Sequence, residues 1–326
     1  MSREGGKEVV CVTGASGYVA SWLVKLLLHR GYTVKATVRN LSDPSKTEHL
    51  KALEGAEERL ELFEADLLQE GSFDSIIHDC VGVFHTASPV TLVTTNPQAD
   101  LIDPAVKGTL NVLKSCCEAK SVRRVVLTSS IVAVAYNRKA IGADVVVDET
   151  CHSDLALCQE NKEWYNLSKT LAEQAAWNFA NENGIDLVVM NPGLVLGPIL
   201  QPTLNFTSQL VVDIIKGKLA VPFYQCVDVR DVAHAHIMGF EKSSASGRYI
   251  LAGEPLTHLQ LMQLLHKLNP SIVDASTSVE ENPIGKVSKK KAESLGVSFM
   301  SMEVSLKDTV ESLKEKKFLN FERCNN

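Results

Sequence analysis

The sequence predicts an α/β fold: a doubly wound parallel sheet with helices on both faces, followed by a smaller C-terminal domain. Two observations carry this prediction. Short apolar runs rich in β-branched residues alternate with helical segments from residue 9 to residue 190, which is the pattern of successive βαβ units. Beyond residue 193 the alternation loosens, and helical segments interrupted by proline occupy 197–225 and 254–318.

The first element is an apolar run, Val9–Val12, which suits a strand buried on both faces at the centre of a parallel sheet. Gly14 and Gly17 follow, and they allow a sharp turn in which bare backbone comes close to a ligand. The next helix aims its N-terminal N–H groups and the positive end of its dipole at that ligand, and a diphosphate suits such a site best. Ala20 lets this helix pack closely on the strand. The residues expected at the ligand are Gly14, Ser16, Gly17, Tyr18 and Val19. The plain alternative is an ordinary tight turn between a strand and a helix.

The second strand, predicted over Thr33–Val38, is followed by a basic residue, Arg39. In an NAD-binding fold an acidic residue usually stands at this place and holds the ribose hydroxyls. The guanidinium of Arg39, with Lys46 close behind, suits a 2′-phosphate instead, which predicts NADP(H) as the cofactor of a Rossmann-type domain. The alternative is a solvated surface arginine.

Three further strands are predicted over Leu60–Ala65, Val81–Thr86 and Val125–Thr128, with a helix between the last two. Asp66, after the first of these, can accept a hydrogen bond from the adenine amine, and Leu67 can pack on the adenine ring. The other cofactor contacts expected at strand ends are Thr86, Ala87, Ser88, Thr128, Pro192, Leu194 and Val195.

A serine, a tyrosine and a lysine stand in an arrangement that suits carbonyl reduction. Ser130 follows the fifth strand, and Tyr165 and Lys169 lie one turn apart on the same face of a helix expected from Lys162. A free phenol has a pKa of about 10, and a neighbouring ammonium together with an oxidised nicotinamide would bring that pKa down. Lys169 can also donate to the nicotinamide ribose, and Ser130 to the carbonyl oxygen. A Tyr–Lys pair alone is common in amphipathic helices, so this interpretation depends on the glycine turn upstream.

The later part of the chain predicts a return to the first domain. A sixth strand is expected over Asp186–Met190, ended by Asn191-Pro192-Gly193, and 227–240 turns back into the main fold. We therefore assign 1–192 to an NADP-binding domain, with 226–250 returning to it. The substrate-binding domain is expected to comprise 193–225 and 251–320.

These motifs together resemble the extended short-chain dehydrogenase/reductase family over nearly the whole chain. The resemblance is carried by Thr13-Gly14-x-x-Gly17, Ser130 and Tyr165-x-x-x-Lys169. It is closest to the plant branch of dihydroflavonol reductases, cinnamoyl-CoA reductases and short-chain cinnamyl-alcohol or phenylacetaldehyde dehydrogenases. That closer match lies in LTSS at 127–130, SKTLAEQAAW at 168–177, NPGLVLGP at 191–198 and DVRDVAHAH at 228–236. The resemblance implies an NADPH-dependent reductase with Ser130, Tyr165 and Lys169 as its catalytic set.

Departures from the branch patterns bear on the substrate. Cinnamoyl-CoA reductases resemble NWYCYGK around the tyrosine, whereas this chain has EWYNLSK at 163–169. Where they carry a histidine and a lysine that serve the thioester, this chain has Leu210 and Asp213, and an acidic side chain would repel the phosphates of CoA. Ala135 replaces an asparagine that dihydroflavonol reductases often carry. We therefore expect a phenylpropanoid-type aldehyde, reduced reversibly to its alcohol as by a cinnamyl-alcohol dehydrogenase. The alternatives are a dihydroflavonol-type ketone, a hydroxycinnamoyl-CoA, or a non-catalytic NADP-binding sensor.

An apolar pocket is expected to hold the aromatic aldehyde. Its predicted substrate contacts are Ser130, Ile131, Ala135, Tyr165, Phe223 and Tyr224, and for any single apolar one plain core packing is the alternative. His85, His234 and His236 receive no catalytic or metal role.

Composition limits the partners. The chain of 326 residues is 45% hydrophobic and 22% charged, and its net charge of −6 disfavours a nucleic-acid surface. No apolar run is long enough to span a bilayer and the first residues are polar, so we expect a cytoplasmic protein without membrane contact, as a monomer or weak dimer. No metal site is expected, because the eight cysteines lack metal-ligand spacing with histidines. Free thiols are expected, and pairing of Cys151 with Cys158 is a lesser alternative.

Overall fold

A parallel sheet of seven strands forms the centre of the molecule, in the order β10-β7-β5-β4-β1-β2-β3. The computed structural model describes residues 8–90, 94–138, 145–219, 223–270 and 286–320. The strand order reverses between β1 and β4, so successive crossovers place helices on opposite faces, and the doubly wound prediction is confirmed. The strands are β1 (Val9–Thr13), β2 (Thr33–Val38), β3 (Leu60–Glu64), β4 (Gly82–His85), β5 (Arg124–Thr128), β7 (Leu187–Pro192) and β10 (Gly247–Leu251).

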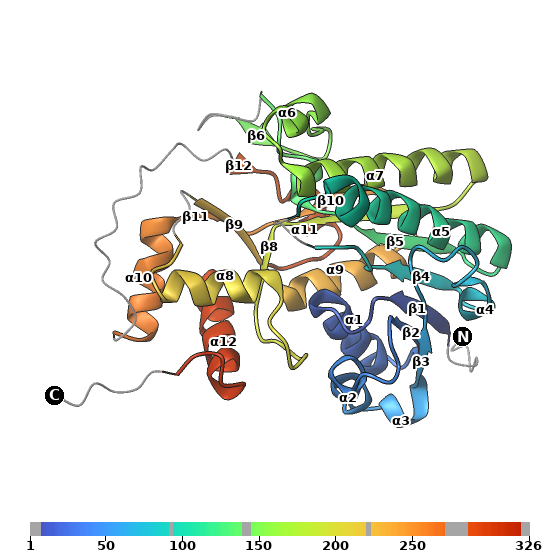
Figure 1. The fold of residues 1–326 in the computed structure, drawn as a ribbon, viewed down its shortest axis with the longest axis horizontal. Coiled ribbons are helices and arrows are strands. Elements are labelled where there is room, and N and C mark those ends of the chain that lie inside the picture. The colour runs from blue at the N-terminus through green and yellow to red at the C-terminus, as the bar shows by residue number, and fades with distance from the viewer. Residues whose placement is uncertain (1–7, 91–93, 139–144, 220–222, 271–285, 321–326) are drawn as a thin grey trace.

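Helices cover both faces of this sheet (Figure 1). On one face α5 (Asp103–Ala119) packs beside α7 (Trp164–Asn183), and on the other α1 (Tyr18–His29) packs beside α9 (Val229–Glu241). Each pair buries its apolar side against the sheet, which gives two separate cores that include Val83 and Val12 respectively. The shorter helices of this part are α2 (Pro44–Lys51), α3 (Ala56–Arg59), α4 (Asp74–Ile77), α6 (Leu155–Glu160), η1 (Gln98–Ile102) and η2 (Ile131–Ala133).

A smaller C-terminal part continues directly from the end of β7 (Figure 1). Gly193 separates β7 from β8, and β8 pairs with β9 in a sheet of three strands, completed by β11. Its strands and helices are β8 (Leu194–Leu196), β9 (Phe223–Asp228), β11 (Pro255–Thr257), α8 (Phe206–Ile215), α10 (His258–Leu268), α11 (Lys290–Ser294) and α12 (Met302–Glu315). A separate pair joins β6 (Val146–Val147) to β12 (Lys286–Val287).

The structure corrects three expectations about the elements. The sixth strand does not end before Asn191, because Asn191 and Pro192 still pair with β10 and the break falls at Gly193. Pro192 is tolerated there because β5 pairs with β7 only as far as Met190, so Pro192 lies beyond the ladder on that side. The seventh strand, β10, and the strands of the small sheet were not predicted. The helix expected from Lys162 begins at Trp164, and the segment between it and the fifth strand contains β6 and α6.

The segment 227–240, predicted to turn back into the main fold, packs against its first helix. Within it, α9 packs on α1, and β10, which follows, adds to the sheet beside β7. The assignment of 193–225 and 251–320 to substrate binding stays a prediction.

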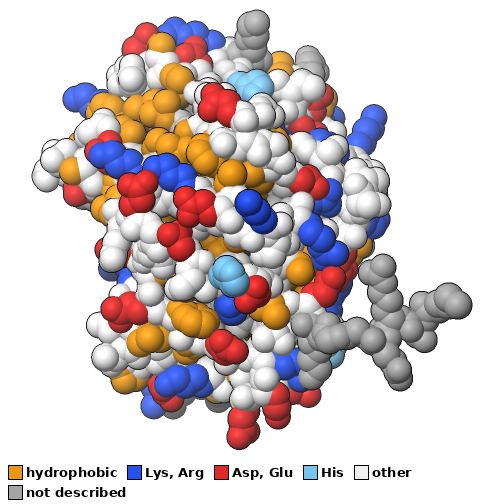
Figure 2. Space-filling view, turned by 90° about the vertical axis from the view of Figure 1, so that its right-hand side faces the viewer, with side chains coloured by type: hydrophobic (Ala, Val, Ile, Leu, Met, Phe, Trp, Pro, Cys, Tyr) orange, Lys and Arg blue, Asp and Glu red, His pale blue; other side chains and the backbone are white. Residues whose placement is uncertain are grey.

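On the face shown in Figure 2, basic and acidic side chains are interspersed rather than gathered by sign. No helix within the described ranges is both long and apolar enough to cross a membrane.

Candidate active site

The turn between β1 and α1 has a shape that only glycine suits. Gly14 has φ +67°, and a Cβ added to it would lie 2.9 Å from the Cβ of Ala87. The N–H of Gly17 donates to the carbonyl of Gly14 (2.9 Å), which closes the turn just before the helix. The first turn of α1 has no side-chain cap and no acidic residue. Its N-terminal N–H groups and dipole are thus available to an anion, and the residues fit the diphosphate of a dinucleotide.

Thr13 holds the neighbouring strand end against this turn. Its hydroxyl oxygen accepts from the N–H groups of Thr86 and Ala87, each at 3.1 Å. With both lone pairs used, the hydroxyl proton goes to Nδ1 of His85 (2.8 Å), so that ring carries its proton on Nε2, toward Thr109. Burial lowers the pKa of His85 to about 3, and the ring stays neutral. His85 is therefore a structural hydrogen-bond partner beside the cofactor turn.

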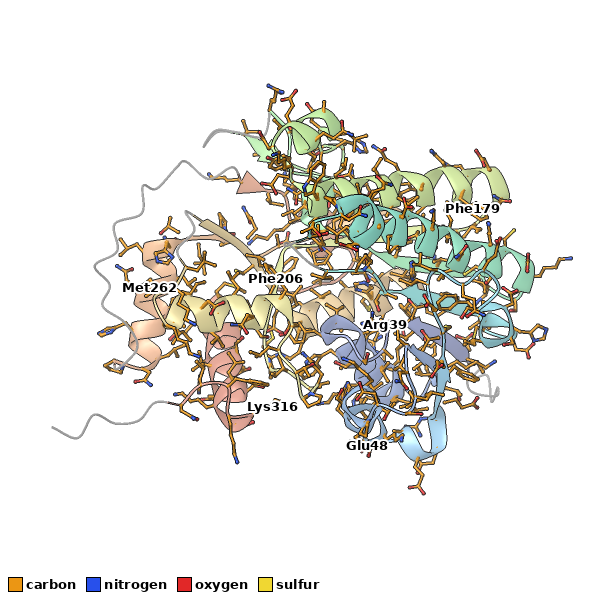
Figure 3. The ribbon with its side chains drawn as sticks, viewed as in Figure 1. Arg39, Glu48, Phe179, Phe206, Met262 and Lys316 are labelled. Atoms are coloured by element: carbon orange, nitrogen blue, oxygen red, sulfur yellow. The ribbon has the colours of Figure 1, made fainter. Side chains whose placement is uncertain are left out.

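The adenosine side of the predicted cofactor site is open and basic. Arg39 is exposed immediately after β2 and forms no ion pair with any described residue, and Lys46 lies half-buried on α2. Figure 3 shows Arg39 near the middle of the molecule, above Glu48 of α2. Asp66 is exposed after β3, where its carboxylate accepts from the N–H of Leu68 (2.8 Å). Leu67 packs against Gly108 of α5.

Ser130, Tyr165 and Lys169 come together at the carboxyl end of β5. Ser130 caps η2, and its side chain hydrogen-bonds to the phenol of Tyr165. Lys169, one turn further along α7, donates from Nζ to the carbonyl of Thr128 (3.0 Å). Ser130 and Lys169 are 8% and 6% exposed, so both groups act in a largely water-free setting. The three predicted side chains thus lie together, with Ser130 and Lys169 buried and Tyr165 half-buried.

Burial shifts the two titrating groups of this cluster in opposite directions. It raises the pKa of Tyr165 above 10.0, against a lowering by the hydrogen bond with Ser130. It lowers the pKa of Lys169 to about 8, against a raising by Glu173. The lowering of the phenol pKa that we expected from Lys169 is not seen in the chain itself: burial raises this pKa, and the opposing contribution comes from Ser130. A phenol with a raised pKa keeps its proton at neutral pH, which suits a proton donor.

Two neighbours of the cluster are not among the predicted site residues: His236 has no catalytic role in the sequence-based prediction, which does not include Glu173. His236 of α9 is fully buried, donates from Nδ1 to the carbonyl of Val232 (2.7 Å) and accepts from the Thr128 hydroxyl at Nε2 (2.7 Å). Glu173 of α7 is 4% exposed and accepts from the amide of Asn191 (2.8 Å). Glu173 lies one turn beyond Lys169 on the same face of α7. This helical spacing could have predicted from the sequence that Glu173 lies near the cluster.

Several other predicted residues are placed less directly. The hydroxyl of Tyr18 donates to the carbonyl of Gly197 (2.7 Å), so this side chain joins α1 to the C-terminal part and only its backbone lies at the helix start. The predicted contacts Pro192, Leu194 and Val195 lie at and just beyond the end of β7, the strand next to β5 in the sheet. Ser16, Val19 and Ser88 are half-buried. These assignments stay predictions.

The predicted substrate contacts lie in two places. Ile131 and Ala135 pack against a small apolar cluster that includes Val134 and Ile250. Phe223 and Tyr224 belong to β9, but their side chains lie outside the described residues. Cys151 and Cys158 are both free thiols, and burial raises the pKa of Cys158 to about 11.

The chain resembles proteins of known family over most of its length. Residues 10–253 match the family described as "NAD dependent epimerase/dehydratase family". The chain belongs to this family. The match includes the glycine turn, the Ser130–Tyr165–Lys169 cluster and the returning strand β10, and the predicted extended short-chain dehydrogenase/reductase relationship is confirmed.

Relatives of this family member are named reductases. Cinnamoyl-CoA reductase CAD2 of Medicago truncatula is 54% identical over 98% of this chain and 100% of that protein. Tetraketide alpha-pyrone reductase 1 of Arabidopsis thaliana is 44% identical over 96% of this chain and 98% of that one. The crystal structure of vestitone reductase from alfalfa (Medicago sativa L.) matches with a TM-score of 0.84 and 35% identity, covering 96% of this chain and 100% of that one.

A structural relative contains the predicted cofactor. The yeast methylglyoxal/isovaleraldehyde reductase Gre2, complexed with NADPH, matches with a TM-score of 0.85 and 29% identity, covering 95% of this chain and 100% of that one. The family, its named reductases and this complex confirm the prediction of an NADP(H)-dependent oxidoreductase.

Proposed function

We propose that this protein reduces a phenylpropanoid-type aromatic aldehyde to its alcohol with NADPH, reversibly. The observation that carries the proposal is the approach of the Ser130 side chain to the phenol of Tyr165, one helical turn from Lys169. Polar groups buried together at a strand end need a reason, because desolvation costs free energy. Here they form a donor set for a carbonyl oxygen, with an ammonium nearby.

Each side chain of the cluster has a distinct part in the proposed reaction. The bound cofactor supplies a hydride to the carbonyl carbon. The Ser130 hydroxyl donates a hydrogen bond to the carbonyl oxygen and stabilises the negative charge that develops on it. Tyr165 transfers its proton to that oxygen, and the Lys169 ammonium stabilises the phenolate left behind. In the reverse direction the phenolate accepts the proton of the alcohol.

The preference for NADPH is supported by the basic residues after β2. Arg39 is exposed, unpaired among the described residues and free to form two parallel hydrogen bonds with a 2′-phosphate. Lys46, on the following helix, adds a second positive charge on the same side. No acidic side chain stands at Arg39, where an NAD-preferring site would place one.

A free aldehyde is favoured over a CoA thioester by α8. Leu210 and Asp213 lie on this helix, both half-buried, where thioester reductases of the branch are expected to carry a histidine and a lysine. A carboxylate in place of a cation weakens attraction for the phosphates of CoA. The second candidate is nevertheless a hydroxycinnamoyl-CoA, because the relative that is 54% identical is named a cinnamoyl-CoA reductase. A ketone substrate has the support of the named pyrone and vestitone reductases.

A substrate panel tests the proposal. Purified protein and NADPH are combined with coniferaldehyde, cinnamaldehyde, phenylacetaldehyde, a hydroxycinnamoyl-CoA and dihydroquercetin, and NADPH oxidation is followed together with product identity. We expect the highest kcat/KM for a free aldehyde. A higher kcat/KM for the thioester or the dihydroflavonol would replace the aldehyde by that substrate. Binding of NADPH without turnover of any carbonyl would refute a reductase and favour a sensor.

A further inference from the structure

A buried ion pair lies behind the Ser130–Tyr165–Lys169 cluster. Nε of Arg248, on β10, is 2.6 Å from Oε1 of Glu173, on α7, and the two side chains are 7% and 5% exposed. An ion pair removed from water is no more stabilising than apolar side chains of similar volume. Its presence therefore calls for a task other than stability.

Both partners of the pair hold the segment that carries Ser130. Oε2 of Glu173 accepts from the hydroxyl of Ser129 and from the amide of Asn191 (2.8 Å), and the same Asn191 amide donates to the carbonyl of Ser130 (3.1 Å). Arg248 donates to the carbonyl of Ala133 (3.1 Å), at the end of the turn that follows. Ser130 is thus held through its own backbone and from the residues on either side.

Arg248 also fixes a second segment. It donates to the carbonyl of Cys151 (2.7 Å) and lies 3.3 Å from Nδ1 of His152. Strand β10 is the edge strand of the large sheet, so the guanidinium joins that edge to the turn after Ser130 and to the segment before α6. The donors of Arg248 are directed at three different segments, an arrangement that a lysine could not reproduce.

We propose that Glu173 and Arg248 are positioning residues of the reductase: together they fix Ser130 at the carbonyl site, and the Glu173 carboxylate keeps Lys169 in its ammonium form. This inference rests on the proposed function and adds to it two residues outside the Ser–Tyr–Lys set. Neither side chain is required to touch the substrate.

The charges that face Lys169 support this role. His85 from β4 and His236 from α9 approach the lysine and its carbonyl partner, but burial lowers the pKa of both, to about 3 and about 4, so both are neutral. Tyr165 holds its proton. Among the described residues, the negative charge that acts on Lys169 is that of the Glu173 carboxylate. This charge opposes the lowering of the Lys169 pKa by burial. On the far side Glu173 faces Arg248, with His152 beyond it.

The test changes the charge of Glu173 without changing its shape. Glu173→Gln leaves Lys169 without its carboxylate, so the pKa of Lys169 falls by about half a unit or more, and the alkaline limit of kcat/KM moves to lower pH by the same amount. Glu173→Asp keeps the charge and restores the limit toward wild type, with a lower kcat because the shorter side chain holds Ser130 less well. Glu182→Gln, an exposed glutamate on the same helix, is the matched control and changes neither.

Two measurements separate the outcomes. The Lys169 pKa is read by heteronuclear NMR of labelled lysine, assigned with Lys169→Arg, and the pH profile by NADPH oxidation. Arg248→Gln removes the opposite charge and moves the Lys169 pKa upward, which keeps the test open if Glu173→Gln does not fold. If Glu173→Gln has the same alkaline limit of kcat/KM and the same Lys169 pKa as the wild-type enzyme, the positioning role is overturned. A wild-type protein that reduces no carbonyl overturns the proposed function instead.

Discussion

A tyrosine and a lysine respond oppositely to the same desolvation at the candidate site. Burial disfavours the charged form of each group, so the phenol of Tyr165 holds its proton more firmly and the ammonium of Lys169 less firmly. Reduction needs a protonated phenol and a charged lysine. We therefore expect the upper pH limit of carbonyl reduction to be set by Lys169 rather than by Tyr165.

The pH dependence of reduction follows from the value for Lys169. Its pKa is lowered to about 8, so the active ammonium form is present below pH 8 and is lost as the pH rises through it. We expect kcat/KM for aldehyde reduction to decrease about tenfold for each pH unit above this limit. The measurement is a pH profile at saturating NADPH. A rate that is constant or rising across pH 8 would contradict this assignment.

Cofactor preference is a second property of single residues. Replacing Arg39 by Asp removes two charge-assisted hydrogen bonds to a 2′-phosphate and adds repulsion, so we expect the preference for NADPH over NADH to fall by about 10–100-fold. Kd values for both cofactors measure it. Arg123→Asp is the control. Arg123 lies just before β5, at the amino ends of the strands, whereas Arg39 follows the carboxyl end of β2, so we expect replacement of Arg123 to leave the NADPH/NADH preference unchanged. An unaltered ratio in Arg39→Asp would remove the role given to Arg39.

At the scale of elements, the junction between β1 and α1 depends on one backbone conformation and one hydroxyl. Gly14 turns the chain with positive φ against Ala87, and Thr13 fixes the strand end that carries Ala87. The helix that follows, α1, starts without a side-chain cap. The proposed diphosphate site and the stability of the fold therefore depend on the same atoms.

Gly14→Ala tests that junction. The new Cβ would lie 2.9 Å from Ala87 in a conformation with φ +67°, so we expect a loss of about 1–3 kcal/mol in the free energy of unfolding and weaker NADPH binding. Gly31→Ala is a matched control, because it has φ +86° with no atom within 4 Å. It carries the strain without the contact. Equal NADPH affinity in both variants would refute the close approach.

The elements also show what local patterns can and cannot predict. The strands of the first domain are apolar runs between helices, so their alternation revealed both the sheet and its parallel order. Strand β10 comes after the alternation has loosened, and strands as short as β8 and β11 show no periodicity. Their pairing is decided by tertiary contacts, such as β10 against β7, that no local window contains.

The site was predictable where its residues have characteristic spacing. Ser130, Tyr165 and Lys169 were predicted from a strand end and one helical turn, and the structure brings them together. Their catalytic roles stay a prediction. Arg248 was missed, because it reaches Glu173 from a strand far away in sequence. The raised pKa of Tyr165 was missed as well, since burial is a property of the folded chain.

At the scale of the whole molecule, α9 joins the large sheet to the C-terminal helices. Arg230 forms ion pairs with Asp228 (2.8 Å) and with Asp308 of α12 (2.7 Å). The carboxylate of Asp231 accepts from the N–H of Met300 (2.7 Å), which lies before α12. Asp228 is fully buried and Asp231 is close to it. Two acidic side chains are therefore removed from water where α9 meets the segment before α12.

The stability of this junction depends on pH through Asp231. Burial, with Asp228, raises the pKa of Asp231 from 3.8 to about 6. A raised folded-state pKa gives stability that is fully present below pH 3.8 and is lost as the pH rises through 6. Relative to wild type, Asp231→Asn should gain about 1–3 kcal/mol in unfolding free energy between acidic and neutral pH. Thermal unfolding of both proteins at each pH measures it, and a difference independent of pH would contradict it.

The account as a whole depends on proton transfer from Tyr165 to a carbonyl oxygen, and Tyr165→Phe tests it most directly. The variant keeps the ring and its packing but lacks the hydroxyl that hydrogen-bonds to Ser130. We predict a loss of at least about 100-fold in kcat/KM for the best aldehyde of the panel, with the Kd for NADPH unchanged. A variant that reduces the aldehyde as fast as wild type would contradict the account.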